Sequence, residues 1–165
     1  MKISRLWLVL AATIGMLALP ATAHADVTIS QAFAADSGDS CRYGLTKGTL
    51  TWRLVSPPTH AVAVSVAGRL ADRPLPADPG AICPDDRRFS IANFAVYAGT
   101  VVVDRQARRV DNGVVSFQFI LGSSSTVARI DRLVVQVCRQ AANGSTVPPA
   151  YCGRAVEYRP IVTTP

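Results

Sequence analysis

The sequence has few of the residues on which enzymes most often depend. Beyond residue 25 it holds one histidine, His60, and one glutamate, Glu157. Catalysis by a serine or cysteine nucleophile needs a histidine base, and His60 follows a Pro-Pro turn that favours an exposed ring. Glycoside hydrolysis needs two carboxyl groups across a cleft; Glu157 is interpreted as an exposed strand residue, which Asp131 could neighbour. We therefore predict a protein that is not an enzyme and has no cofactor.

Positive charge is not concentrated in any one segment. The arginines are scattered and mostly stand beside aspartates, as in Asp72-Arg73 and Asp104-Arg105. Proteins that bind nucleic acids usually gather cations on one face with aromatic residues among them. The pattern instead predicts a solvated surface of mixed charge and no nucleic-acid partner.

Long apolar runs are absent after the N-terminus, which itself has the features of a signal peptide. Lys2 and Arg5 form a basic region, residues 6–19 an apolar one, and Ala23-His24-Ala25 a small-x-small cleavage site. The apolar run is short for a membrane span and no later segment replaces it, so no membrane anchor is expected. We predict that residues 1–25 are removed and that residues 26–165 form one secreted, extracellular domain.

Four cysteines are present, all in the exported part. An even number in an oxidising compartment predicts two disulfides, and four cysteines allow three pairings. We predict Cys41–Cys83 and Cys138–Cys152, because an antiparallel hairpin between each pair returns the chain to its starting point. No cysteine pair has C-x₂-C spacing, and His60 is remote in sequence, so no zinc or other metal site is predicted from them.

The clearest structural pattern is two alternating segments, residues 49–55 and 61–70, separated by Ser56-Pro57-Pro58-Thr59. Two segments of period 2 joined by a short proline-rich turn predict a β-hairpin with one buried face. Trp52 falls on the apolar side of the first segment. We expect its ring to be buried against the apolar side of the second, Val62, Val64 and Val66.

Other short alternating segments lie between Gly, Pro and Asn turns. Residues 27–33 predict an edge strand. Phe89 and Ile91 are out of phase with Phe94 and Val96, which predicts a strand bulged near Ala92-Asn93. The chain as a whole predicts an all-β protein, a single antiparallel β-sandwich of seven or eight strands, immunoglobulin-like or jelly-roll. The remaining expected strands are 101–105, 115–121, 133–138 and 154–158.

Several local motifs accompany this pattern. They are the A-x-A cleavage site, the segment CRYGLTKGTLTW from Cys41 to Trp52, Arg73-Pro74-Leu75-Pro76 and Tyr151-Cys152-Gly153. With these features the chain resembles small exported actinobacterial proteins of unassigned function. The shared motifs are structural, so the resemblance implies an exported disulfide-bonded domain and no particular activity.

Three kinds of binding function are compatible with such a domain. The first is a secreted interaction module that binds an unknown protein or cell-surface ligand, with the loops at 73–86 and 139–151 as the candidate contact regions. The second is a protease inhibitor that presents a disulfide-braced loop. The third is a glycan-binding sandwich, against which the expected burial of Trp52 argues. A monomer is expected in each case.

The predicted Cys41–Cys83 bond has a further consequence for nearby charges. It would bring together four carboxylates, which repel one another unless a cation lies among them. Calcium is one such cation. Built-in arginines are the other, and we favour them because they pair bidentately with carboxylates and because the EF-hand spacing is absent. The carboxylates are Asp36, Asp39, Asp85 and Asp86, and the arginines are Arg42, Arg87 and Arg88.

Overall fold

The computed structural model describes residues 27–55, 60–74, 80, 82–84, 86–122, 129–141 and 151–161. Within them the protein has nine strands and no helix. The number exceeds the seven or eight expected because a two-residue strand, β8, precedes the last one. The strands are β1 (Val27–Asp36), β2 (Gly44–Val55), β3 (His60–Asp72), β4 (Arg88–Ala98), β5 (Val101–Val110), β6 (Val114–Leu121), β7 (Arg132–Ala141), β8 (Tyr151–Cys152) and β9 (Val156–Tyr158).

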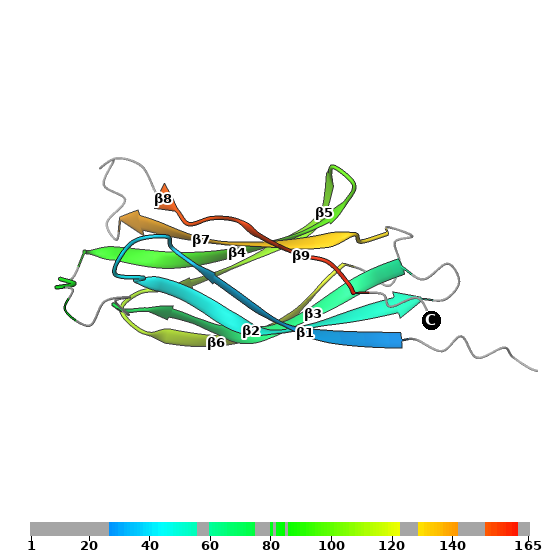
Figure 1. Ribbon diagram of the computed structural model, residues 1–165, viewed down its shortest axis with the longest axis horizontal. Coiled ribbons are helices and arrows are strands. Elements are labelled where there is room, and N and C mark those ends of the chain that lie inside the picture. The colour runs from blue at the N-terminus through cyan, green and yellow to red at the C-terminus, as the bar shows by residue number, and fades with distance from the viewer. Residues whose placement is uncertain are drawn as a thin grey trace, which may run out of the picture.

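Two antiparallel sheets pack face to face, which confirms the predicted β-sandwich (Figure 1). Sheet A has the strand order β1-β2-β3-β6. Sheet B has the order β5-β4-β7-β8, and β9 pairs with β7 as well. Two neighbour pairs, β3–β6 and β4–β7, join strands that are distant in sequence, one pair in each sheet.

The predicted hairpin is formed by β2 and β3. Trp52 lies opposite Val64 and is fully buried, as expected. The register shifts beside Arg53, which lies opposite Ala63, whereas Leu54 lies opposite Ala61. Val62 is therefore skipped, and Ala61 takes its place in the core with 1% of its surface exposed. The expected apolar face is correct at Val64 and Val66 and wrong at Val62, which is only half-buried.

The bulge expected at Ala92-Asn93 does not exist. Pairing of β4 with β7 runs without a break from Arg88↔Ala141 to Tyr97↔Arg132, and the irregularity with β5 falls later, at Val96/Tyr97. The phase change in the sequence arises because apolar residues also occupy the outer face of sheet B. Phe89 and Ile91 lie on the outer face of sheet B, where the guanidinium of Arg109 covers the Phe89 ring at 3.7 Å.

Two glycines make room for aromatic rings in the core. Gly48 and Gly68 lie opposite each other in one cross-strand row of sheet A. In that row Phe33 of β1 flanks Gly48 and Phe117 of β6 flanks Gly68. Phe94 of sheet B packs edge-on against both rings, at centroid distances of 5.9 Å and 5.3 Å. A Cβ at Gly48 would meet the Ala67 carbonyl at 2.1 Å and the Phe33 ring at 2.8 Å, so no larger residue fits.

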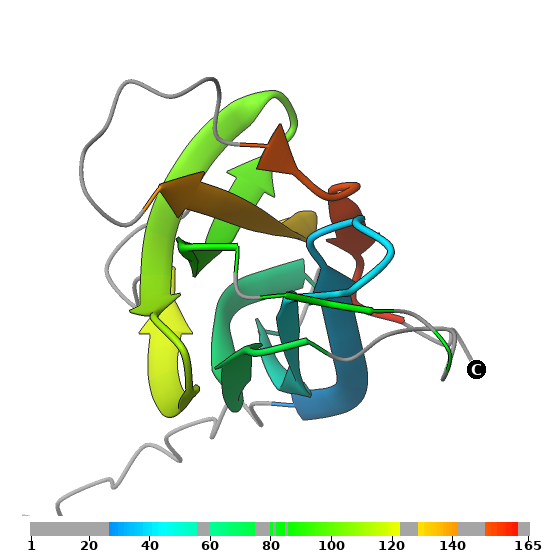
Figure 2. The ribbon, with the colours of Figure 1, turned by 90° about the vertical axis from the view of Figure 1, so that its left-hand side faces the viewer.

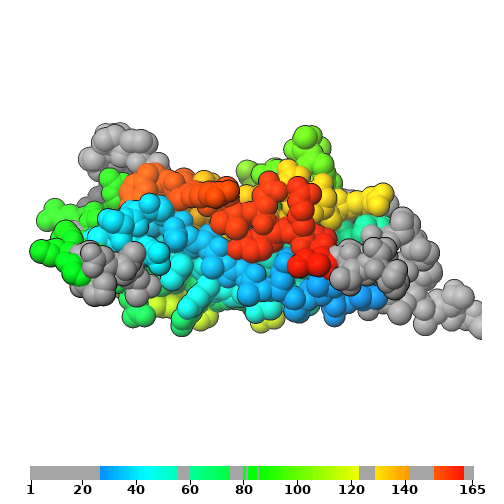
Figure 3. Space-filling view, in the orientation of Figure 1, coloured from blue at the N-terminus to red at the C-terminus, as the bar shows by residue number. Residues whose placement is uncertain are grey.

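The edge of sheet A formed by β1 is covered by the C-terminal segment. The Tyr158 hydroxyl donates to the Ala34 carbonyl oxygen at 2.7 Å and accepts from the Ala34 N–H at 2.9 Å. Gln31 adds a bond from its amide to the carbonyl of Arg159. Residues 151–161 therefore lie along β1 (Figure 3), and the edge position predicted for β1 is confirmed.

Candidate functional site

One end of the sandwich holds both disulfides, and we call it the disulfide end (Figure 2). Strands β1, β3, β5 and β7 end there, and β2, β4, β6 and β8 begin there. Cys41–Cys83 joins the β1–β2 connection to the β3–β4 connection. Cys138–Cys152 joins directly opposed residues of β7 and β8, with Cα atoms 4.0 Å apart. Both predicted pairings are confirmed. Of the two loops singled out in the sequence, half of 73–86 and residues 142–150 of 139–151 lie outside the described residues.

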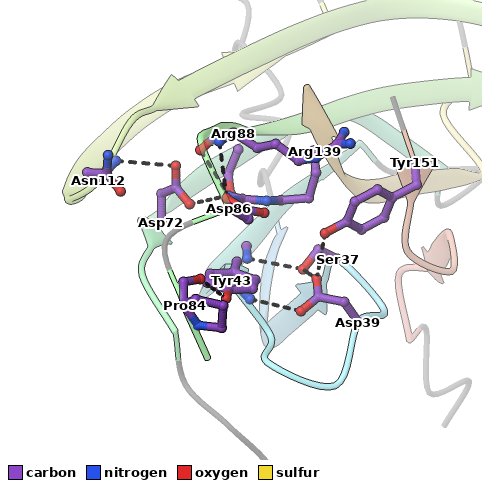
Figure 4. Close-up of polar contacts among 12 residues, drawn as sticks. Ser37, Asp39, Tyr43, Asp72, Pro84, Asp86, Arg88, Asn112, Arg139 and Tyr151 are labelled. Carbon is purple, nitrogen blue, oxygen red and sulfur yellow. Dashed lines mark hydrogen bonds and ion pairs between the residues drawn. The ribbon is translucent and has the colours of Figure 1, made fainter. Parts of the chain in front are cut away.

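The centre of this end is a buried guanidinium, that of Arg139 in β7. Its side chain is 1% exposed and forms an ion pair with Asp72, the last residue of β3, which is equally buried. A second ion pair, at 2.5 Å, joins it to Asp86 in the β3–β4 connection. It also donates to the Ser90 hydroxyl at 2.7 Å and to the Arg88 carbonyl at 3.2 Å (Figure 4). One side chain thus ties sheet A, sheet B and a loop together.

Burial sets the electrostatics of this group. It raises the pKa of the Asp72 carboxyl above its ordinary value, and the hydrogen bond and charge of Arg139 oppose that shift without cancelling it. For Arg139, burial alone would lower the pKa, but Asp86 and Asp72 outweigh it and the net shift is upward. Arg139 therefore remains a cation, held by two acids in a site with little water.

A second polar cluster lies beside it around Asp39. Its carboxylate accepts hydrogen bonds from the Ser37 hydroxyl and from the Tyr43 N–H, the latter at 3.3 Å. Tyr151 donates to it at 3.3 Å, and burial followed by the nearby Asp39 charge raises the pKa of that phenol. The Arg88 guanidinium lies 5.5 Å from the centre of the Tyr151 ring. The β1–β2 connection is thereby attached to β8.

The acidic residues expected to gather here do so only in part. Asp36 accepts a hydrogen bond from the Gly38 N–H at 2.9 Å and Asp39 is bonded as above. Asp86 lies against Arg139, a cation that was not among the three expected. Asp85 lies outside the described residues. Within the described part of the chain, no three His, Cys, Asp or Glu side chains form a group that could hold a metal.

The sequence contained a signal for Arg139 and Asp72 that the expectations above did not use. Both continue the inward phase of their strands, after Leu133, Val135 and Val137 in β7 and after Val64, Val66 and Leu70 in β3. Opposite charges at the inward position that ends each of two strands indicate a buried ion pair.

The other carboxylates considered above lie away from this end. Asp131 and Glu157 are brought near each other as supposed, but Arg132 contacts both, at 2.9 Å and 3.8 Å. His60 begins β3, at the opposite end of the sandwich from the disulfides. The Ser37 hydroxyl is 1% exposed and engaged with Asp39. The described side chains of the disulfide end therefore form a rigid frame rather than a nucleophile–base pair.

One apolar side chain projects from this frame. Ile82 is 92% exposed and directly precedes Cys83. On its C-terminal side, the Tyr43 hydroxyl donates to the carbonyl of Pro84. A disulfide and a buried tyrosine (8% exposed) thus fix the backbone on one side of an isoleucine that has almost no contact of its own.

Comparisons with known proteins find no matching family model, no matching curated protein and no matching solved structure. In the described residues, no helix is long and apolar enough to cross a membrane.

Proposed function

We propose that the protein is an exported, non-enzymatic binding module that uses the disulfide end to contact a protein or cell-surface ligand. The observation that carries this proposal is the convergence of both disulfides and the buried Arg139 group at that end. A frame that is already rigid loses little entropy when its loops bind, which favours affinity. Loops on a rigid sandwich are also where such domains place their binding residues.

Export and the immunoglobulin-like variant of the sandwich are parts of the same proposal. Two disulfides are typical of oxidising compartments, and N-terminal sequencing of the secreted protein would test cleavage after Ala25. In immunoglobulin-like domains, sequence-distant strands lie side by side in both sheets, as β3–β6 and β4–β7 do. We propose a monomer, which sedimentation of the purified protein would test.

Site-specific photocrosslinking tests the binding surface. A photoreactive residue is placed at Ile82 and, as the matched control, at Ile161, which is 64% exposed and follows β9, beyond the pairing of Tyr158 with Leu133 near the start of β7. With intact host cell envelope and secreted proteins, we expect one discrete, saturable product from position 82 and none from position 161. Equal yields from both positions, or products from neither, would contradict the proposal.

A protease inhibitor is the second candidate, and Ile82 is the observation that favours it. An exposed aliphatic side chain beside a disulfide can enter the specificity pocket of a protease while the fixed backbone resists release after cleavage. Inhibition constants against extracellular serine proteases with aliphatic, aromatic and basic preferences would test this. We expect inhibition of the first class only and its loss in Ile82→Asp, with Ile161→Asp unaffected. The absence of inhibition in all three classes would exclude this candidate.

A further inference from the structure

The outer face of sheet A carries a hollow of about 580 Å³, in the half of its strands nearer the disulfide end. Its floor is the backbone of Gly48 and Gly68, seen from the side of the sheet that faces away from the core. Its walls are small residues, two hydroxyls and two cations from all four strands of the sheet. These are Ala32 and Ala34 of β1, Lys47 and Thr49 of β2, Arg69 of β3 and Ser116 of β6.

The two cations are direct cross-strand neighbours. Lys47 lies opposite Arg69 in the β2–β3 register, and both side chains are exposed. Like charges in this position repel each other, which weakens the pairing of their strands. Neither side chain has a hydrogen bond or an ion pair in the described part of the chain, and no carboxylate lines the hollow. The positive potential there is left for a ligand to neutralise.

We propose that this hollow binds a phosphate group of a linear anionic glycan whose sugars are joined through phosphodiesters. Directly opposed residues have Cβ atoms about 5 Å apart, so an arginine and a lysine can reach the same tetrahedral anion. Arginine binds phosphate oxygens bidentately, and the hydroxyls of Thr49 and Ser116 supply further donors for the adjoining sugars.

The lining of the hollow favours a glycan over other anionic polymers. Phe33 is the one aromatic residue that lines it, and that ring is 3% exposed, so nucleobases find no surface to stack on. Aliphatic side chains longer than alanine are absent from the lining, so nothing there would insert into a lipid surface. The hollow crosses four strands, about 14 Å, which fits a few sugars of a thin polar chain.

Calorimetric titration with a defined oligomer of glycosyl phosphates tests the proposal, with the neutral oligomer of the same sugars as the reference. We expect saturable binding of the phosphate oligomer alone, weakened by salt because the contacts are exposed ion pairs. Arg69→Gln should weaken binding by at least about tenfold. Arg105→Gln removes the same charge from the outer face of sheet B and should leave binding unchanged.

The variant Lys47→Glu distinguishes a loss of ligand binding from a loss of folding stability. It places a carboxylate opposite Arg69, an attractive cross-strand pair, so the melting temperature should stay unchanged or rise while binding is lost. Retained binding in this variant, an equal loss in Arg105→Gln, or no binding by the wild-type protein would each overturn the proposal. So would preferential binding to anionic phospholipid vesicles or to a single-stranded oligonucleotide. Photocrosslinking from Ile82 should not respond to Arg69→Gln, so the two surfaces are tested independently.

Discussion

Loss of the Arg139 side chain should strongly destabilise this protein. The guanidinium compensates two carboxylates, Asp72 and Asp86, and Asp72 is 1% exposed. Truncating one member of a buried ion pair leaves the other charge without compensation, and the pair itself stabilises much less than that loss suggests.

We therefore expect Arg139→Met to lower the free energy of unfolding by about 3–5 kcal/mol. Urea denaturation measures it, with Arg105→Met as the exposed control that should change it by less than about 0.5 kcal/mol. Adding Asp72→Asn to Arg139→Met should recover part of the loss, because it removes the uncompensated charge. If the double variant lost more unfolding free energy than the two single variants lose together, this account of the pair would be contradicted.

Asp72 also predicts a dependence of stability on pH. Because its pKa is raised in the folded protein, the fold holds this proton to a higher pH than the unfolded chain does. The resulting stabilisation is fully present below about pH 4 and is lost as the pH rises through the raised folded pKa. The stability of the wild type relative to Asp72→Asn should therefore fall across that window. Denaturation curves collected from about pH 3 to about pH 7 measure the difference, and a constant difference would refute the shift.

Trp52 gives a prediction about the core. It is fully buried, yet its indole Nε1 has no hydrogen-bond partner among the described residues. Trp52→Ala should cost about 3–5 kcal/mol of stability through the cavity it leaves. Trp52→Phe should cost clearly less, because the indole N–H contributes no hydrogen bond that could be lost. Thermal unfolding of the two variants side by side decides this, and equal costs would mean that the N–H has a partner.

At the level of the strands, alternation predicted the β2–β3 hairpin, the edge position of β1 and the hairpin that Cys138–Cys152 closes. It failed where the phase depends on a neighbouring strand. The register shift at Arg53/Leu54 puts Ala61 inside, and no residue type marks it. The outward Phe89 was misread because its cover, Arg109, comes from the next strand. Period 2 defines two faces but does not say which face is buried.

The contact between Tyr158 and the edge of β1 can be tested by removing one oxygen atom. Tyr158→Phe keeps the ring, which packs at 6.3 Å from Phe33, and removes the hydroxyl bonded to both polar backbone groups of Ala34. We expect a loss of about 1 kcal/mol and faster hydrogen exchange at the Ala34 amide. The amide of Lys47, opposite Ala34, is the internal control. Unchanged exchange at Ala34 would mean that the hydroxyl does not protect this edge.

At the scale of the whole molecule, neither the strand order nor the site at the disulfide end was predicted in full. The pairs β3–β6 and β4–β7 connect segments whose patterns are compatible with many partners. The cysteine pairing was predictable because it required only that a hairpin return the chain to its start. The cation against Asp86 was not, because Arg139 reaches it from a strand 53 residues later in the chain.

The two disulfides should differ in what they contribute. The chain segment between Cys41 and Cys83 spans 42 residues and that between Cys138 and Cys152 spans 14. In the loop-entropy model the first stabilises by about 4 kcal/mol and the second by about 3 kcal/mol. Paired Cys→Ser variants compared by denaturation would measure this. A larger loss from the Cys138/Cys152 variant would show that strain or structure in the unfolded chain outweighs loop length.

The position of Tyr158 links the order of synthesis to the risk of aggregation. A ribosome completes β1 and its partner β2 more than a hundred residues before it adds the tyrosine that covers the outer side of β1. Throughout that interval the strand offers free amides and carbonyls to any other chain. A product that ends prematurely before β9 would keep that exposed side permanently. Synthesis of the last few residues is therefore the step that protects the β1 edge from pairing with other copies of the chain.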